Sequence, residues 1–193
     1  MGYLQSFENY IPKWEQEVLD KKAILAFIER NEDSLERSNL VAHITSSAII
    51  TNKEMNKVLF AHHNIYNSWA WVGGHNDSDP DLLHVALKEA KEETGIRNIE
   101  PYDSDILCID VIYVENHIKN GIYVPDHLHL NATFLLVGNE DDNLIIKEDE
   151  NSGVRWFLIS EVMSYIKEER IKSVYQKAFD EIERLRCKKS LWF

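Results

Sequence analysis

The chain has 193 residues, 44% of them hydrophobic, which is enough for the core of one medium domain with an additional element and excludes a disordered chain. Its net charge of −12 argues against binding of duplex nucleic acid, because that partner requires a basic face. No apolar run approaches the roughly 20 residues that cross a bilayer, and the first residues lack the pattern of a secretory signal, so we expect a soluble, cytoplasmic protein without a membrane partner.

Residues 1–39 are predicted to form an N-terminal helical extension. Trp14, Val18, Leu25 and Ile28 recur near helical spacing among charged residues and form an apolar stripe. A short helix cannot bury such a stripe alone. The stripe must therefore lie on the main domain, residues 40–193, or on a second copy of the chain in a homodimer. A frayed terminal tail is the alternative.

The main domain is predicted to begin with a hairpin. The stretch 42–51 is rich in Ile, Thr and Ser, and KVLFAHH at 57–63 reads as the returning strand. Later elements are strands over 106–114, 127–137 and 154–159, followed by a long helical stretch over 160–186. Strands, one helix, more strands and a final helix indicate a mixed α/β sandwich.

The clearest predicted helix spans 79–94. Asp79 is a suitable N-cap, Pro80 suits the first helical position, and Gly95 suits the C-terminal end. An apolar stripe faces the predicted core, and its members are Leu83, Ala86, Leu87 and Ala90.

Three carboxylates lie on one side of this helix. Glu89, Glu92 and Glu93 are spaced i, i+3 and i+4, and like charges at such spacing repel one another. Lys88 and Lys91 are predicted to point at other angles and not to pair with them. Hard divalent cations such as Mg²⁺ prefer oxygen ligands, so the trio predicts a metal site. A solvated charged face near a helix end is the alternative.

The stretch 74–96, GHNDSDPDLLHVALKEAKEETGI, resembles the Nudix box, G-x5-E-x7-R-E-U-x-E-E-x-G-U, where U is a bulky apolar residue. The matching residues are Gly74, Glu89, Ala90, Glu92, Glu93, Gly95 and Ile96. Pro80 stands where the family has glutamate, and Lys88 where it has arginine. In the family those two residues hold the loop against the helix, so we expect another arrangement here, such as the Asp79–Pro80 helix start.

The resemblance covers roughly residues 41–162 and implies a Nudix-type α/β/α sandwich around a mixed sheet. It further implies a Nudix pyrophosphohydrolase that uses Mg²⁺ or Mn²⁺ and cleaves a nucleoside-diphosphate-linked small molecule. The departures at Pro80 and Lys88 leave open a catalytically weak or inactive ligand-binding or regulatory module of the same fold. A prenyl diphosphate isomerase is disfavoured, because it needs a cysteine in the cleft and Cys108 lies in an apolar run.

The same resemblance implies the roles of individual residues. The metal ligands would be the carbonyl of Gly73 and the carboxylates of Glu89, Glu92 and Glu93. An acidic residue of a later loop often joins them, and Glu150 fits best, with Asp149 and Glu148 as rivals. Either Glu92 or Glu89, or a metal-bound hydroxide, would activate the attacking water.

Histidines are the predicted substrate-binding residues. His127, His129 and Asn131 alternate in HLHLN and therefore share one face of a strand. We expect this face to line the substrate cleft, an exposed strand face being the alternative. His75, directly after Gly73-Gly74, is also predicted to contact substrate. The identity of the diphosphate substrate stays open among nucleoside triphosphates, ADP-sugars, dinucleoside polyphosphates and coenzymes.

Overall fold

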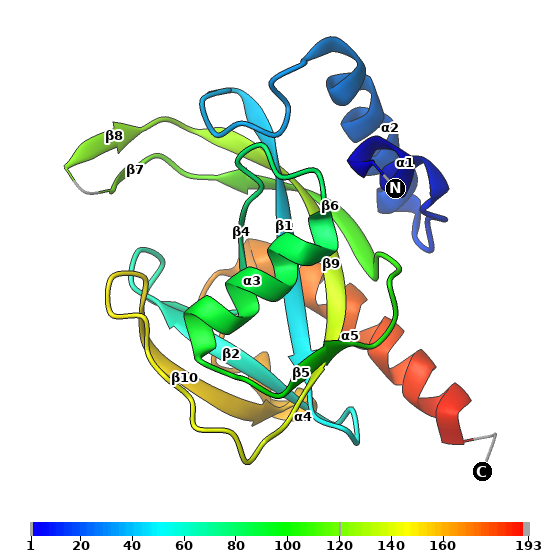
Figure 1. Cartoon of the computed structure of the whole chain (residues 1–193), viewed down its shortest axis with the longest axis vertical. Coiled ribbons are helices and arrows are strands. Elements are labelled where there is room, and N and C mark those ends of the chain that lie inside the picture. The colour runs from blue at the N-terminus through cyan, green and yellow to red at the C-terminus, as the bar shows by residue number, and fades with distance from the viewer. Residues whose placement is uncertain (1, 120, 191–193) are drawn as a thin grey trace.

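A computed structural model describes residues 2–119 and 121–190 (Figure 1). The strands are β1 (Ala42–Thr51), β2 (Lys57–His63), β3 (Ser68–Ala70), β4 (Val72–His75), β5 (Ile99–Pro101), β6 (Cys108–Val114), β7 (His117–Lys119), β8 (Ile122–Val124), β9 (His127–Gly138) and β10 (Asn151–Leu158). The helices are α1 (Tyr3–Asn9), α2 (Glu15–Arg30), α3 (Leu82–Thr94), α4 (Ile159–Val162) and α5 (Glu169–Ser190).

Strand β1 is the centre of a mixed eight-stranded sheet of order β10-β2-β1-β9-β5. It pairs in parallel with β9 along its whole length and antiparallel with β2 and β4. Strand β6 pairs with the other side of β9. All ten residues of β1 are buried, as expected for a strand covered on both faces.

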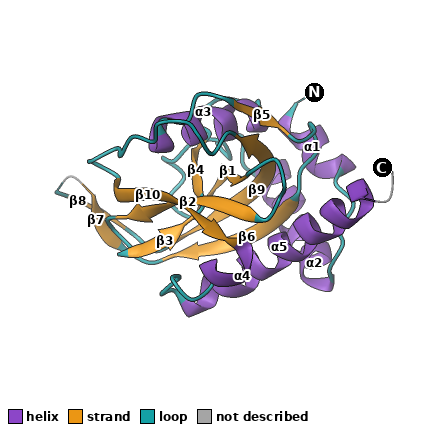
Figure 2. Ribbon diagram, turned by 90° about the horizontal axis from the view of Figure 1, so that it is seen from below, coloured by secondary structure: helices purple, strands orange, loops and turns teal. Residues whose placement is uncertain are grey.

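Helices cover both faces of this sheet (Figure 2). Even-numbered residues of β1 and β9, such as Ile44 and Leu130, pack in one core with helix α3 and with Phe7 and Ile24 of the N-terminal helices. Odd-numbered residues such as Ile49 pack in a second core with helix α5. The predicted α/β/α sandwich with a mixed sheet and an N-terminal helical extension is confirmed.

The odd-numbered face of β1 and β9 changes character along the strands. It is apolar where α5 covers it, and polar at the end where β1 begins. The polar residues there are His43, Thr45 and Ser47 on β1 and His127, His129 and Asn131 on β9. Because a strand alternates faces with a period of two, the topology gathers these side chains at one end of the sheet.

The N-terminal helices pack on the domain through a face that differs from the prediction. Ile24 and Ile28 are buried and Leu25 is partly buried, but Val18 is 55% exposed. Instead of Val18, the preceding residue Glu17 faces the sheet, and it is fully buried. The predicted apolar stripe was therefore wrong at Val18, because a charged residue occupies the inward position in the first turn.

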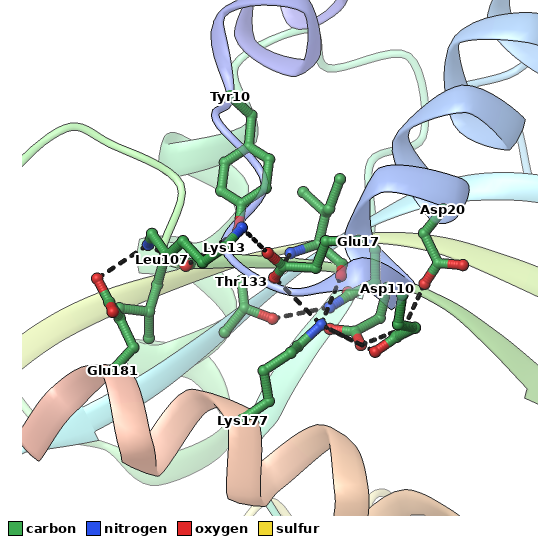
Figure 3. Close-up of polar contacts among 12 residues, drawn as sticks. Tyr10, Lys13, Glu17, Asp20, Leu107, Asp110, Thr133, Lys177 and Glu181 are labelled. Atoms are coloured by element: carbon green, nitrogen blue, oxygen red, sulfur yellow. Dashed lines mark hydrogen bonds and ion pairs between the residues drawn. The ribbon is translucent and has the colours of Figure 1, made fainter.

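Glu17 has a structural reason for its burial (Figure 3). Its Oε1 lies 3.2 Å from Nζ of Lys177 on α5, and Lys177 also contacts Oδ1 of Asp110 on β6 at 2.8 Å. The backbone N–H of Ile109 donates to Glu17, and that of Val111 donates to Asp20. Helix α2 thus covers the unpaired edge of β6 with carboxylate acceptors, which satisfies an edge that would otherwise be open.

Several element boundaries correct the sequence predictions. Helix α3 begins at Leu82 with Asp81 as its N-cap, accepting from the backbone N–H of His84 at 3.0 Å, and not at Asp79 with Pro80 inside the helix. The long helix predicted over 160–186 is divided into α4 and α5. The strands β5, β7 and β8 were not predicted, because three residues are too few to show a periodic pattern.

Within the described part of the chain, none of the helices is both long and apolar enough to cross a bilayer.

Candidate active site

Strand β4 contains two adjacent glycines, Gly73 and Gly74, that pack closely against other groups. A Cβ on Gly74 would lie 2.6 Å from Cδ of Glu89, and a Cβ on Gly73 would lie 2.7 Å from the carbonyl oxygen of Ser46. Both contacts are closer than a side chain tolerates. The backbone of β4 therefore lies directly beside the carboxylate of Glu89, whose side chain is 13% exposed.

Glu93 is the most buried carboxylate of the helical trio, with 1% of the residue exposed. Its Oε1 accepts a hydrogen bond of 2.9 Å from the backbone N–H of Gly73. Among the described residues, none forms a hydrogen bond with its buried Oε2. Burial, together with the negative charges of Glu150 and Glu89, raises the pKa of Glu93 to about 8, against the lowering effect of the Gly73 hydrogen bond. Glu93 is therefore no solvated surface charge.

His63 faces Glu93, with Nε2 3.6 Å from Oε2. Burial lowers the pKa of this imidazole below its usual value. A neutral imidazole beside a carboxyl with a raised pKa does not make an ion pair at neutral pH, and 3.6 Å is too long for a hydrogen bond. The contact leaves Oε2 of Glu93 available to another partner.

Two lysines lie against the remaining carboxylates. Lys88 Nζ lies 3.3 Å from Oε1 of Glu89 and 3.9 Å from Glu92. Lys147 Nζ lies 3.0 Å from Glu150 and 3.8 Å from Glu92. The expectation that lysines would not pair with the helical carboxylates was wrong, because Lys88 reaches along its helix and Lys147 arrives from the loop before β10. Lys147 therefore bridges Glu150 of the loop and Glu92 of the helix.

The loop between β4 and α3 is held by side chains outside the resembling motif. Asn76 is buried and accepts from Ser46 Oγ at 3.0 Å, while its amide donates to the carbonyl of Asp79 at 2.9 Å. Arg37 forms a two-pronged ion pair with Asp77. The expected Asp79–Pro80 helix start is replaced by these contacts and by the Asp81 cap, which explains how the loop is secured with Pro80 and Lys88 in the motif.

A cleft of about 790 Å³ opens over this site. Its lining includes every predicted site residue except the buried Glu93, namely Gly73, Glu89, Glu92, Glu150, His75, His127 and His129. Asn131 is in the same lining, and its Oδ1 accepts from Thr45 at 2.9 Å and from Ser47 at 2.8 Å. The predicted shared face of HLHLN therefore points into the cleft.

Sequence reasoning missed four residues that the fold adds to this region. His43, His63, Arg37 and Lys147 all line the cleft. Arg37 comes from the end of the N-terminal extension, so that segment supplies part of the cleft wall. His43 is the second residue of β1 and lies on the same face as Thr45. This period-two alternation is the one sequence signal that could have placed His43 in the cleft. The other three sit in no local pattern.

The site offers oxygen ligands for a divalent cation, but among the described residues the carboxylate oxygens do not already converge on one point. The candidate donors are the carboxylates of Glu89, Glu92, Glu93 and Glu150, with the backbone of Gly73 beside them. An oxygen of Glu93 that is buried and lacks a hydrogen bond within the described residues is costly unless a partner occupies it. Oxygen donors of this kind suit Mg²⁺ and Mn²⁺.

The fold and this site define a class of proteins in which glutamates of one helix lie beside two glycines of a neighbouring strand. The profile of the NUDIX domain matches residues 41–179, and the chain therefore belongs to the Nudix family. Among curated proteins, none matches the chain.

Solved structures show the same fold at low identity. A NUDIX-family hydrolase from Clostridium perfringens is 20% identical, with a TM-score of 0.52 over 72% of this chain and 96% of that chain. A MutT protein from Methanosarcina mazei Go1 is 17% identical, with a TM-score of 0.52 over 76% and 96%. An Ap4A hydrolase from C. elegans is 16% identical, with a TM-score of 0.50 over 69% and 93%.

Proposed function

We propose that the chain is a metal-dependent pyrophosphohydrolase that cleaves a nucleoside-diphosphate-linked small molecule. The observation that carries this proposal is the buried Oε2 of Glu93, which lacks a hydrogen bond among the described residues, at the base of a wall formed with Glu89, Glu92 and Glu150. A buried carboxylate oxygen without a partner is unfavourable, and a bound cation would offset that cost.

The proposed metal ligands are Gly73, Glu89, Glu92, Glu93 and Glu150. A divalent cation held there would neutralise the oxygens of a pyrophosphate and stabilise the charge on the leaving phosphate. Glu92 or Glu89 would take a proton from the attacking water. The water oxygen would form the new bond to phosphorus, and the bond from that phosphorus to the bridging oxygen would break.

The cleft walls suit the two ends of such a substrate. His75, His127 and His129 line the same cleft as the two glycines of β4, and we propose that these histidines contact substrate. The β7–β8 hairpin also lines the cleft and presents Ile122 and Tyr123, which are 69% and 61% exposed. Exposed apolar and aromatic side chains at a cleft suit the flat face of a nucleobase.

The decisive experiment is a screen of nucleoside triphosphates, ADP-sugars, dinucleoside polyphosphates and coenzymes with Mg²⁺ and with Mn²⁺. We expect one class to be cleaved at its pyrophosphate, and chelation with EDTA to stop the reaction. Glu92→Gln should lower kcat by several orders of magnitude with unchanged thermal melting. Turnover that persists in EDTA, or near-normal turnover of Glu92→Gln, would overturn the proposal.

A second candidate is a ligand-binding module without catalysis. Lys88 and Lys147, which already pair with Glu89, Glu92 and Glu150, favour this alternative. It predicts that nucleotides bind, as measured by calorimetry, but stay uncleaved with either metal.

A further inference from the structure

Four histidines from three strands meet at the polar end of the sheet. His43 comes from β1, His75 from β4, and His127 and His129 from β9. One ring nitrogen of each can be chosen so that all four atoms lie within 4.8 Å of one another. Strand register explains the meeting: His43 is the direct parallel neighbour of His129, and His75 is paired with Thr45, two residues along β1.

The backbone orients two of these rings. Nδ1 of His43 lies 3.1 Å from the carbonyl oxygen of Asn39, and Nδ1 of His127 lies 2.8 Å from that of Pro125. A carbonyl only accepts, so each Nδ1 carries a proton and each neutral ring keeps its lone pair on Nε2. Both lone pairs then face the cluster. Metal-bound histidines are oriented in this way, by an outer hydrogen bond from the second ring nitrogen.

Among the described residues, one inward nitrogen has no hydrogen-bond partner, and another is bonded only to a ring within the cluster. Nε2 of His43 is buried, and within the described ranges no residue forms a hydrogen bond with it. Nε2 of His127 instead lies 3.2 Å from Nε2 of His129. A buried lone pair without a donor is unfavourable. A cation among the four rings would satisfy these nitrogens together.

Three of the four imidazoles have a lowered pKa. Burial lowers the pKa of His75 to about 3, with help from the positive charge of Arg37 and from His43. Burial and the other three histidines lower the pKa of His129 well below its usual value. Burial also lowers the pKa of His43. The deprotonated imidazole is the form that binds metals, so the direction of these shifts agrees with the geometry of the cluster.

We propose that His43, His75, His127 and His129 form a second metal site, which takes a borderline divalent transition ion, zinc, beside the carboxylate site. Imidazole ligands suit zinc, whereas Mg²⁺ prefers the oxygens of the glutamates. Four protein ligands make a closed tetrahedral site, which stabilises structure. The ion would join β1, β4 and β9, and β4 also contains the two glycines of the carboxylate site. This inference does not depend on the proposed hydrolysis, and it gives His75, His127 and His129 a structural role in place of direct contact with substrate.

The test uses the untagged full chain, stripped of metal and kept in excess Mg²⁺ so that the carboxylates are already occupied. Titration with Co²⁺ should give the intense visible bands of a tetrahedral site, saturating at one equivalent, and Zn²⁺ should displace them. X-ray absorption of the zinc-loaded wild-type protein should show nitrogen ligands only. A weak octahedral spectrum, or a shell of oxygens, would overturn the proposal without any variant.

Variants separate the two metal sites. His43→Leu and His127→Ala, which lie on different strands, should each weaken zinc binding by more than the about 10- to 100-fold that loss of an outer partner costs. His84→Ala is the matched control, because His84 lies outside the cluster with a 62% exposed side chain. Glu92→Gln should abolish Mg²⁺-dependent hydrolysis and keep the cobalt spectrum. Loss of the spectrum in Glu92→Gln, with retention in the histidine variants, would place the ion at the carboxylates and refute the proposal.

Discussion

The backbone N–H of Gly73 on β4 donates a 2.9 Å hydrogen bond to the buried carboxyl of Glu93 on α3. The strand that leads into the loop and the helix that follows it are therefore tied by one side chain. Because that carboxyl is also the proposed metal ligand, the state of its proton links stability, pH and cation binding.

We predict that Glu93 makes the protein lose stability as pH rises in EDTA. Its folded pKa of about 8 is above the ordinary value of 4.5, so the folded state holds a proton that the unfolded state releases. The stabilisation is complete below pH 4.5 and is lost as pH rises through 8. The unfolding free energy should decline by about 1.4 kcal/mol per pH unit within this window, relative to Glu93→Gln. Urea titrations at stepped pH measure it.

Glu92→Gln is the control for that experiment. Glu92 has a 44% exposed side chain and sits one position away on the same helix. Its substitution should leave the decline with pH in place. Parallel pH profiles for the wild type and Glu93→Gln would show that the proton on Glu93 has no such effect.

We predict that Lys147→Met strengthens Mg²⁺ binding. The ammonium lies 3.0 Å from Glu150 and 3.8 Å from Glu92, so it competes with a cation for both carboxylates. Half-exposed pairs of this kind are worth up to about 1 kcal/mol, so the Mg²⁺ concentration for half-maximal binding should fall about 2- to 5-fold. Calorimetry with Mg²⁺ measures this, with Lys91→Met on the exposed side of α3 as control. A higher Mg²⁺ requirement would mean that Lys147 supports the metal site.

We predict that Lys177→Met strongly destabilises the fold. Lys177 lies between the buried carboxylates of Glu17 and Asp110, and its removal leaves two buried charges without a cation. Breaking a buried pair in this way costs about 3–5 kcal/mol. Denaturant unfolding at neutral pH measures the change. Lys172→Met on the same helix, whose partner Glu169 is exposed, should change stability by less than about 1 kcal/mol.

We predict that removing residues 1–39 lowers the melting temperature and uncovers the edge of β6. The truncated chain loses Phe7, Ile24 and Ile28 from the core, and the Arg37 contact with Asp77. Ile24→Ala in the full chain should cost about 2–5 kcal/mol, whereas Val18→Ala, at an exposed site, should cost little. If melting temperature, mass by light scattering and activity all stay unchanged, the segment is a tail.

Local sequence patterns were sufficient to predict the helices and strands that are determined by the spacing of their own residues. The helix of α3 places Glu89, Glu92 and Glu93 on adjoining positions whatever surrounds it, because its geometry repeats every 3.6 residues. The central strands and the shared face of His127, His129 and Asn131 follow from the period of two. The left-handed backbone of Gly95, with φ of 71°, ends the helix at the predicted residue.

Tertiary structure decided everything that joins distant segments. The burial of Glu93 depends on β4 lying against α3, and its raised pKa follows from that burial. The parallel pairing of β1 with β9 sets His43 beside His129, and no rule of local sequence specifies which strands become neighbours. The inward position of Glu17 needs Lys177 from the far end of the chain. The burial and the partners of the carboxylates and imidazoles depend on residues distant in sequence, which only the folded chain brings near. Helices and strands, in contrast, follow from the periodic spacing of their own residues.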